Sequence, residues 1–117
     1  MPEDLLDRTK RFSHQILDLC ESAPTNRTAG VLTHQLMRSG TSVGAHYREV
    51  QHARSDAEFT SKIESGLQEL NESIYWIELL KERHLVDQDE ALALLDEANQ
   101  LTAIFITIVK KAKARSN

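Results

Sequence analysis

The sequence predicts an all-α fold, an up-down-up-down antiparallel four-helix bundle. Two observations support this prediction. Apolar residues recur at steps of three and four through four segments of the 117-residue chain, which places them on one face of each helix. The breaks between the segments are short, and short connections make consecutive helices antiparallel neighbours. A single domain over residues 1–117 is therefore expected, with helices at about 3–22, 27–53, 56–84 and 88–114.

The first segment, residues 3–22, begins with acidic side chains, which suit the positive end of a helix dipole. Pro24 ends it, because proline disfavours helix at the residue before it. The single cysteine of the chain, Cys20, is interpreted as a small buried hydrophobic residue. The expected apolar face comprises Leu5, Phe12, Ile16, Leu19, Cys20 and Ala23.

The second segment, residues 27–53, combines apolar and very small side chains on one face. Glycine inside a helix costs about 1 kcal/mol relative to alanine, so two glycines four residues apart indicate that another backbone comes close. Close helix packing is therefore expected at Ser39, Gly40 and Gly44. The apolar positions of the same face are Leu32, Leu36, Val43, Tyr47 and Val50.

The third segment, residues 56–84, begins with a capping box formed by Ser55 and Glu58. Its core stripe comprises Phe59, Ile63, Leu67, Leu70, Ile74 and Ile77. A second stripe, expected to point away from the core, comprises Tyr75, Trp76, Leu79 and Leu80. A helix that is apolar nearly all round is buried on more than one side, which in so short a chain predicts a partner subunit.

The fourth segment, residues 88–114, follows a capping box of Asp87 and Glu90. Its core face comprises Ala91, Leu94, Leu95, Ala98, Leu101, Phe105, Ile108, Val109 and Ala112. Ile104 and Ile106 widen the apolar arc beyond what three neighbouring helices cover. Together with the second stripe of the third segment, these residues predict self-association. If the two surfaces are different patches, the contact is heterologous and builds a ring.

The bulk composition limits the classes of partner. The net charge is −4, so the chain as a whole is not typical of a nucleic-acid binder. One cysteine cannot form an internal disulfide, and no signal peptide is recognised at the charged start, so a cytoplasmic location is expected. No apolar run approaches the about 20 residues of a membrane span, and no membrane partner is expected.

The predicted topology separates charge between the two ends of the bundle. One end collects the starts of the first and third helices and the ends of the second and fourth. It holds ten of the 14 cations and seven of the 18 acids, a net +3, which leaves −7 at the other end. The basic end either binds phosphates or only complements the helix dipoles. Its candidate contacts with nucleic acid are Arg8, Arg11, Arg48, Arg54, Lys110, Lys111, Lys113 and Arg115.

The stretch SVGAHYREVQHARSDAEF, at residues 42–59, resembles the four-helix-bundle family encoded in intervening sequences of bacterial 23S ribosomal RNA genes. The small-residue run at 39–45, Glu49 and the Glu58-Phe59 pair match the family pattern, as does IYWIELL at 74–80. His46 stands where the family usually has asparagine. The resemblance implies a ring-like homopentamer. A related protein, the strongly basic accessory variability determinant of diversity-generating retroelements, binds a reverse transcriptase and nucleic acid.

Two weak patterns for enzymatic chemistry occur in the sequence. His46 and Glu49, three residues apart, could share a metal, but a bundle metal site needs several inward-facing carboxylates. The Arg-to-His spacing of some helical nucleases occurs twice by chance, at 8–14 and 27–34. Neither pattern predicts catalytic residues, a metal or a cofactor.

The sequence therefore predicts a non-enzymatic, self-assembling helical bundle that acts as a scaffold or adaptor. Through its basic end it would bind nucleic acid, or a partner protein that processes nucleic acid. The alternative is a helical nuclease or a metal-dependent enzyme.

Overall fold

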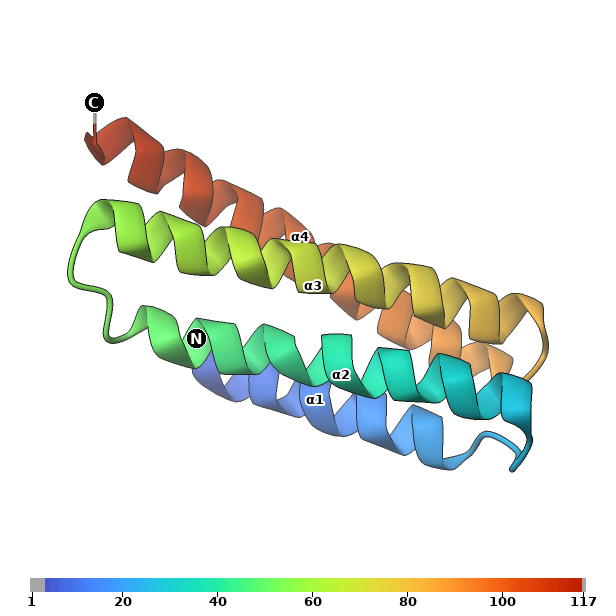
Figure 1. Ribbon diagram of the computed structural model, residues 1–117. Helices are drawn as coiled ribbons and strands as arrows, with labels where there is room; N and C mark the ends of the chain where they lie inside the picture. The colour runs from blue at the N-terminus through green and yellow to red at the C-terminus, as the bar shows by residue number, and fades with distance from the viewer. Residues whose placement is uncertain (1–3, 117) are drawn as a thin grey trace.

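The computed structural model describes residues 4–116 and confirms the all-α prediction. Its four helices are α1 (Leu5–Glu21), α2 (Arg27–Val50), α3 (Asp56–Glu82) and α4 (Gln88–Ser116), and no strand occurs in the described part of the chain. The molecule is elongated, with principal extents of 49 × 29 × 20 Å. Each helix runs opposite to the one before it (Figure 1).

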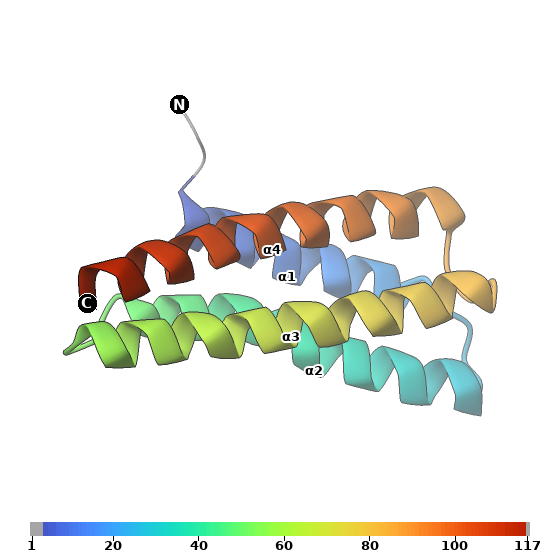
Figure 2. The ribbon, with the colours of Figure 1, turned by 90° about the horizontal axis from the view of Figure 1, so that it is seen from above.

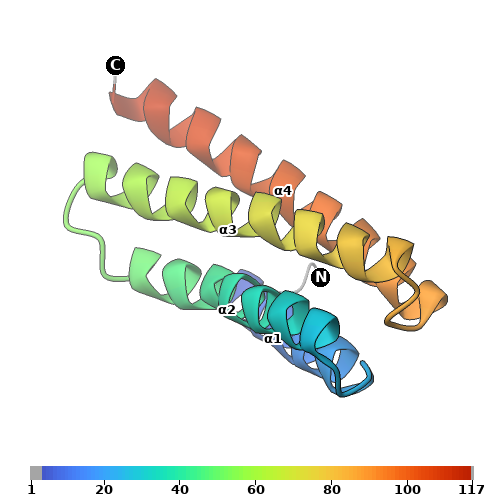
Figure 3. The same ribbon diagram turned by 45° about the vertical axis from the view of Figure 1, so that its right-hand side comes forward.

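The helices are not packed equally against one another. Each of α1, α2 and α3 packs along the helix that follows it, whereas α1 and α4 touch only sparsely. Seen from above, α4 passes in front of α1, and α3 passes in front of α2 (Figure 2). A rotated view shows α1 beside α2 and α3 beside α4 (Figure 3). The bundle therefore consists of two helix pairs joined mainly through α2 and α3.

Side-chain caps fix where the helices begin. The side chains of Asn26, Ser55 and Asp87 accept hydrogen bonds of 2.9–3.0 Å from backbone N–H groups three residues further on. Such bonds satisfy N–H donors that the first turn leaves unpaired. At the other end of α3, His84 has a φ of 56°, the left-handed conformation that commonly terminates a helix. α2 ends at Val50, three residues before the predicted end, because Gln51 to Ala53 form turns.

The core forms one continuous cluster, and its largest fully buried side chains include Phe12, Phe105, Ile16 and Leu36. One prediction was wrong. Leu80, which was assigned to the outward stripe of α3, is fully buried. It extends the core pattern of alternating three- and four-residue steps through Leu70, Ser73 and Ile77. Leu80 therefore belongs to the core and contributes nothing to an exposed interface.

A buried polar contact joins α2 to α3 at their middle. The hydroxyl oxygens of Ser39 and Ser73 lie 2.9 Å apart, and the Ser73 hydroxyl also lies 2.7 Å from the carbonyl oxygen of Glu69. Ser73 can donate to that carbonyl and accept from Ser39, so each buried hydroxyl proton has an acceptor. Two small side chains thus bring the two central helices close together.

By length and composition, α4 over Gln88–Arg115 could cross a membrane. No such run was predicted from the sequence. The core helix of a bundle has the same composition. In this fold one face of α4 is buried against the other helices, including Leu101 and Phe105.

Candidate interaction surfaces

The predicted close-packing residues of α2 serve two different neighbours. A Cβ atom at Gly40 would lie 2.7 Å from Cγ1 of Ile16, and one at Gly44 would lie 3.3 Å from the backbone oxygen of Thr9. Both glycines therefore admit α1. Ser39 lies on the side of α3, where it contacts Ser73.

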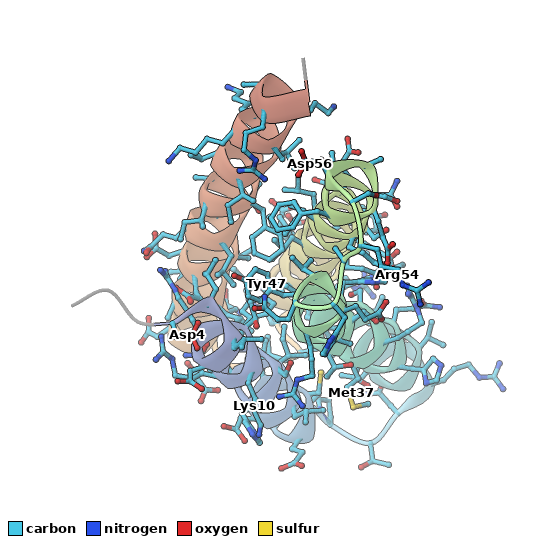
Figure 4. All side chains as sticks on the ribbon, turned by 90° about the vertical axis from the view of Figure 1, so that its left-hand side faces the viewer. Asp4, Lys10, Met37, Tyr47, Arg54 and Asp56 are labelled. Carbon is cyan, nitrogen blue, oxygen red and sulfur yellow. The ribbon has the colours of Figure 1, made fainter. Side chains whose placement is uncertain are left out.

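Gly66 of α3 allows α4 to pack closely, a role that was not predicted from the sequence. A Cβ atom at Gly66 of α3 would lie 2.7 Å from the ring of Phe105. The same ring lies 5.8 Å from that of Tyr47, centroid to centroid. In the view onto this end of the bundle, Tyr47 points from α2 into the space towards α4 (Figure 4). These aromatic rings fill the region where the two helix pairs diverge.

The outward stripe of α3 is real but smaller than predicted, and we call Tyr75, Trp76 and Leu79 the aromatic patch. Tyr75 is 54% exposed, and Trp76 and Leu79 are half-buried. The rings of Tyr75 and Trp76 meet edge to face with centroids 5.0 Å apart. The indole N–H of Trp76 donates to a carboxylate oxygen of Glu72 at 3.0 Å. Its orientation is therefore set within the chain itself.

The aromatic patch continues onto α2, which the sequence analysis missed. Arg38 of α2 forms ion pairs with Glu72 and Glu69 of α3. Two turns before Arg38 lies Val31, and two turns beyond Glu72 lies Leu79, so antiparallel helices place these two residues opposite each other. Val31 is 56% exposed. Its position on the surface follows from the α2–α3 register, which the sequence alone does not specify.

The two isoleucines predicted for the second apolar surface lie on different sides of α4. Ile106 is 40% exposed and points outward. Ile104 is half-buried and lines a hollow of about 370 Å³, which we call the α4 groove, together with Ala103, Thr107, Ile108 and Lys111. The groove lies beyond the first residue of α1. Arg8 of α1 pairs with Glu97 of α4, and α1 begins at Leu5, only one turn before Arg8. Because the two helices are antiparallel, Ile104, two turns after Glu97, lies past Leu5. The shorter α1 thus leaves this part of α4 uncovered.

Several cations predicted for the basic end are engaged with acids. Arg8 binds Glu97 through two hydrogen bonds of 2.8 Å and also contacts Gln100 at 2.8 Å. This half-buried pair connects α1 to α4. Lys113 lies 3.4 Å from Glu64, and Arg115 lies 3.7 Å from Asp56 and over the ring of Phe59. The remaining predicted contacts are all exposed: Arg11, Arg48, Arg54, Lys110 and Lys111.

One pair of cations at this end shares a hollow between α1 and α2. Lys10 and Arg48 line a space of about 300 Å³ above Gly44, beside Leu6 and Ser13. No acidic side chain lines it. The sequence placed Lys10 at the basic end but did not single it out, because the α1–α2 register decides which cations face each other.

The weak enzymatic patterns do not converge on a site. The Glu49 carboxylate is exposed and lies 2.5 Å from the ammonium of Lys62, whose hydrogen bond and charge lower the pKa of Glu49. His46 keeps its buried Nδ1 without a hydrogen-bond partner in the part of the chain that the structure describes. Between residues 4 and 116, no three side chains of His, Cys, Asp or Glu gather as metal ligands. Cys20 is buried, and burial raises the pKa of its thiol to about 11.

Comparison with known proteins places the chain in a family. Residues 4–107 match the sequence pattern described as 23S rRNA-intervening sequence protein. The chain is also similar to a solved structure from Bacteroides thetaiotaomicron, a protein with unknown function from the S23 ribosomal protein family. The two share 30% sequence identity over 92% of this chain and 99% of that one, with a TM-score of 0.85. No curated protein matches this chain significantly. The resemblance predicted from residues 42–59 is thus confirmed, and the chain belongs to the 23S rRNA-intervening sequence protein family.

Proposed function

We propose that this protein is a non-enzymatic cytoplasmic scaffold or adaptor, an up-down-up-down bundle that assembles into a ring-like homo-oligomer. The observation that carries the proposal is the aromatic patch, continued by Val31. Its tryptophan is held in place by Glu72 yet remains partly open to solvent. Exposed aromatic side chains with a fixed orientation are typical of the residues that dominate protein–protein contacts.

The geometry of the surfaces favours a ring. The aromatic patch lies on the outer side of α2 and α3, whereas the α4 groove lies past the start of α1, so the two are different surfaces. A contact between two different surfaces repeats from subunit to subunit, and it closes into a ring when the rotation permits. The family resemblance supports five subunits.

Light scattering behind a sizing column tests the assembly. We expect wild type at micromolar concentration to have a mass of several times 13.3 kDa. Trp76→Glu is expected to reduce the mass to that of one subunit with helicity retained, because burying an unpaired charge costs several kcal/mol. His14→Glu, on the exposed side of α1, is the matched control and should assemble normally. A wild-type monomer across the concentration range would refute the proposal.

A second activity, the binding of nucleic acid or of a partner that processes it, is favoured by the hollow of Lys10 and Arg48. These two cations share a space without an acidic lining, which suits a phosphate. A ring of parallel subunits would bring several such hollows to one side. Because phosphate binding releases counterions, the affinity is expected to fall steeply as salt rises.

A salt titration of RNA and DNA binding tests this activity. Replacing both cations, Lys10→Gln with Arg48→Gln, should reduce both the affinity and the salt slope. Lys113→Gln, which removes a cation already paired with Glu64, should change little. If both variants bind like wild type, or if wild type binds no nucleic acid at low salt, the basic end is not a nucleic-acid site. RNA cleavage or stoichiometric metal in the same preparation would instead favour the enzymatic alternative.

A further inference from the structure

Another hollow lies at the opposite, acidic end of the bundle, between the start of α2 and the end of α3. Its volume is about 530 Å³, and its lining includes Arg27, Thr28, Glu82, Arg83 and His84. This size is within the range of pockets that hold small molecules. The hollow shares no lining residue with the α4 groove or with the hollow at the basic end, and Arg27 and Arg83 lie one turn beyond Val31 and Leu79.

The cations that line this hollow lie at an end of the bundle where acidic side chains predominate. Eleven of the 18 acids, but only four of the 14 cations, were assigned to this end from the sequence, and ten acids remain there once Glu97, which binds Arg8, is counted with the other end. Two of those four, Arg27 and Arg83, line the same hollow, and within residues 4–115 neither has an acidic group within 4.0 Å. Arg38, by contrast, is held by Glu69 and Glu72. Both arginines thus keep their guanidinium donors available to a ligand.

The electrostatic potential in the hollow is set by its side chains and not by the helix dipoles. The positive start of α2 and the negative end of α3 both border it, so their dipoles largely offset each other. His84 adds an imidazole in a turn where its φ of 56° would suit glycine or asparagine better. Glu82 adds an acceptor and a negative charge, which disfavours a bare anion.

We propose that this hollow binds a small phosphorylated polyol, such as a sugar phosphate. Arg27 and Arg83 donate charge-assisted hydrogen bonds to the phosphate oxygens, and the His84 imidazole donates another. The Glu82 carboxylate accepts from a hydroxyl group of the same molecule. Inorganic phosphate carries its hydroxyl on the phosphorus itself, so contact with Glu82 brings the phosphate charge close to the carboxylate. A phosphorylated polyol has hydroxyl groups on carbons away from the phosphate, and the arrangement therefore favours it over the inorganic ion.

Calorimetric titration at low salt tests the site with ribose 5-phosphate, inorganic phosphate and ribose as probes. Ribose 5-phosphate is expected to bind more tightly than either of the other two. Arg83→Gln and Arg27→Gln should each weaken it by about tenfold, the usual effect of losing a hydrogen bond between charged groups. Arg54→Gln is the matched control, because Arg54 is an exposed cation next to a helix end at the other pole.

His84→Gly separates binding from folding. It relieves the left-handed backbone and should raise the melting midpoint, yet it should also weaken ribose 5-phosphate binding severalfold. The proposal is overturned if wild type does not bind ribose 5-phosphate at about 10 mM, a concentration at which even weak millimolar affinity is detected. It is also overturned if Arg54→Gln weakens binding as much as Arg83→Gln, or if inorganic phosphate binds equally well.

Discussion

At the scale of single residues, the four glycines differ in what surrounds them. Gly44 lies against the backbone of Thr9, and Gly66 receives the ring of Phe105, whereas a Cβ atom at Gly30 would meet nothing within 4 Å. A side chain at the first two positions forces a neighbour to move. At Gly30 only the helix-forming tendency changes.

Gly44→Leu should therefore destabilise the bundle by about 1–3 kcal/mol or more, because a side chain larger than a methyl group has no room against α1. Gly30→Ala should stabilise it by up to about 1 kcal/mol through helix propensity alone. Thermal melts at a fixed protein concentration measure both. A higher midpoint for Gly44→Leu than for wild type would show that α1 does not approach α2 as described.

Cys20 gives a second prediction at this scale. Burial raises the pKa of its thiol from 9.0 to about 11, so the folded state favours the neutral thiol over the thiolate. Stability from this group is complete below pH 9 and is lost as the pH rises towards 11. Wild type should therefore lose more stability than Cys20→Ala between these pH values, as denaturant melts would measure. Parallel pH curves for the two proteins would contradict the assigned burial.

At the scale of elements, apolar spacing was enough to predict four helices, and capping residues placed several of their starts. It was not enough to assign Leu80, because the buried position Ser73 is polar and interrupts the apolar pattern that runs from Leu70 through Ile77 to Leu80. The neighbours of Val31 and Arg8 depend on how far each helix slides along the next. That register is set by three-dimensional packing, so neither the extended patch nor the Arg8–Glu97 pair could be predicted.

The Arg8–Glu97 pair compensates for the sparse contact between α1 and α4. Because its two side chains are only 19% and 15% exposed, Arg8→Gln should destabilise the protein by about 1–2 kcal/mol and speed hydrogen exchange in the first turns of α1. Lys113→Gln, at a pair 60% and 49% exposed, should cost less than about 0.5 kcal/mol. Equal losses of stability in the two variants would mean that the contact between α1 and α4 does not depend on the Arg8–Glu97 pair.

At the scale of the whole molecule, the relation between the aromatic patch and the α4 groove distinguishes a ring from a symmetric dimer. In an isologous contact, each surface meets its own copy. In a heterologous contact, the patch of one subunit enters the groove of the next. The two arrangements differ in what happens when each surface is damaged on a different molecule.

Trp76→Glu disables the patch, and Ala103→Glu places a charge in the α4 groove at an exposed position that should not affect folding. For a heterologous contact, neither variant assembles alone. Their mixture, however, combines one intact patch with one intact groove and should form a species of about twice 13.3 kDa that cannot grow further. Light scattering of the two variants, alone and mixed, measures this directly. A mixture that stays monomeric while wild type assembles would show that these two surfaces do not meet, and the ring would then need another contact.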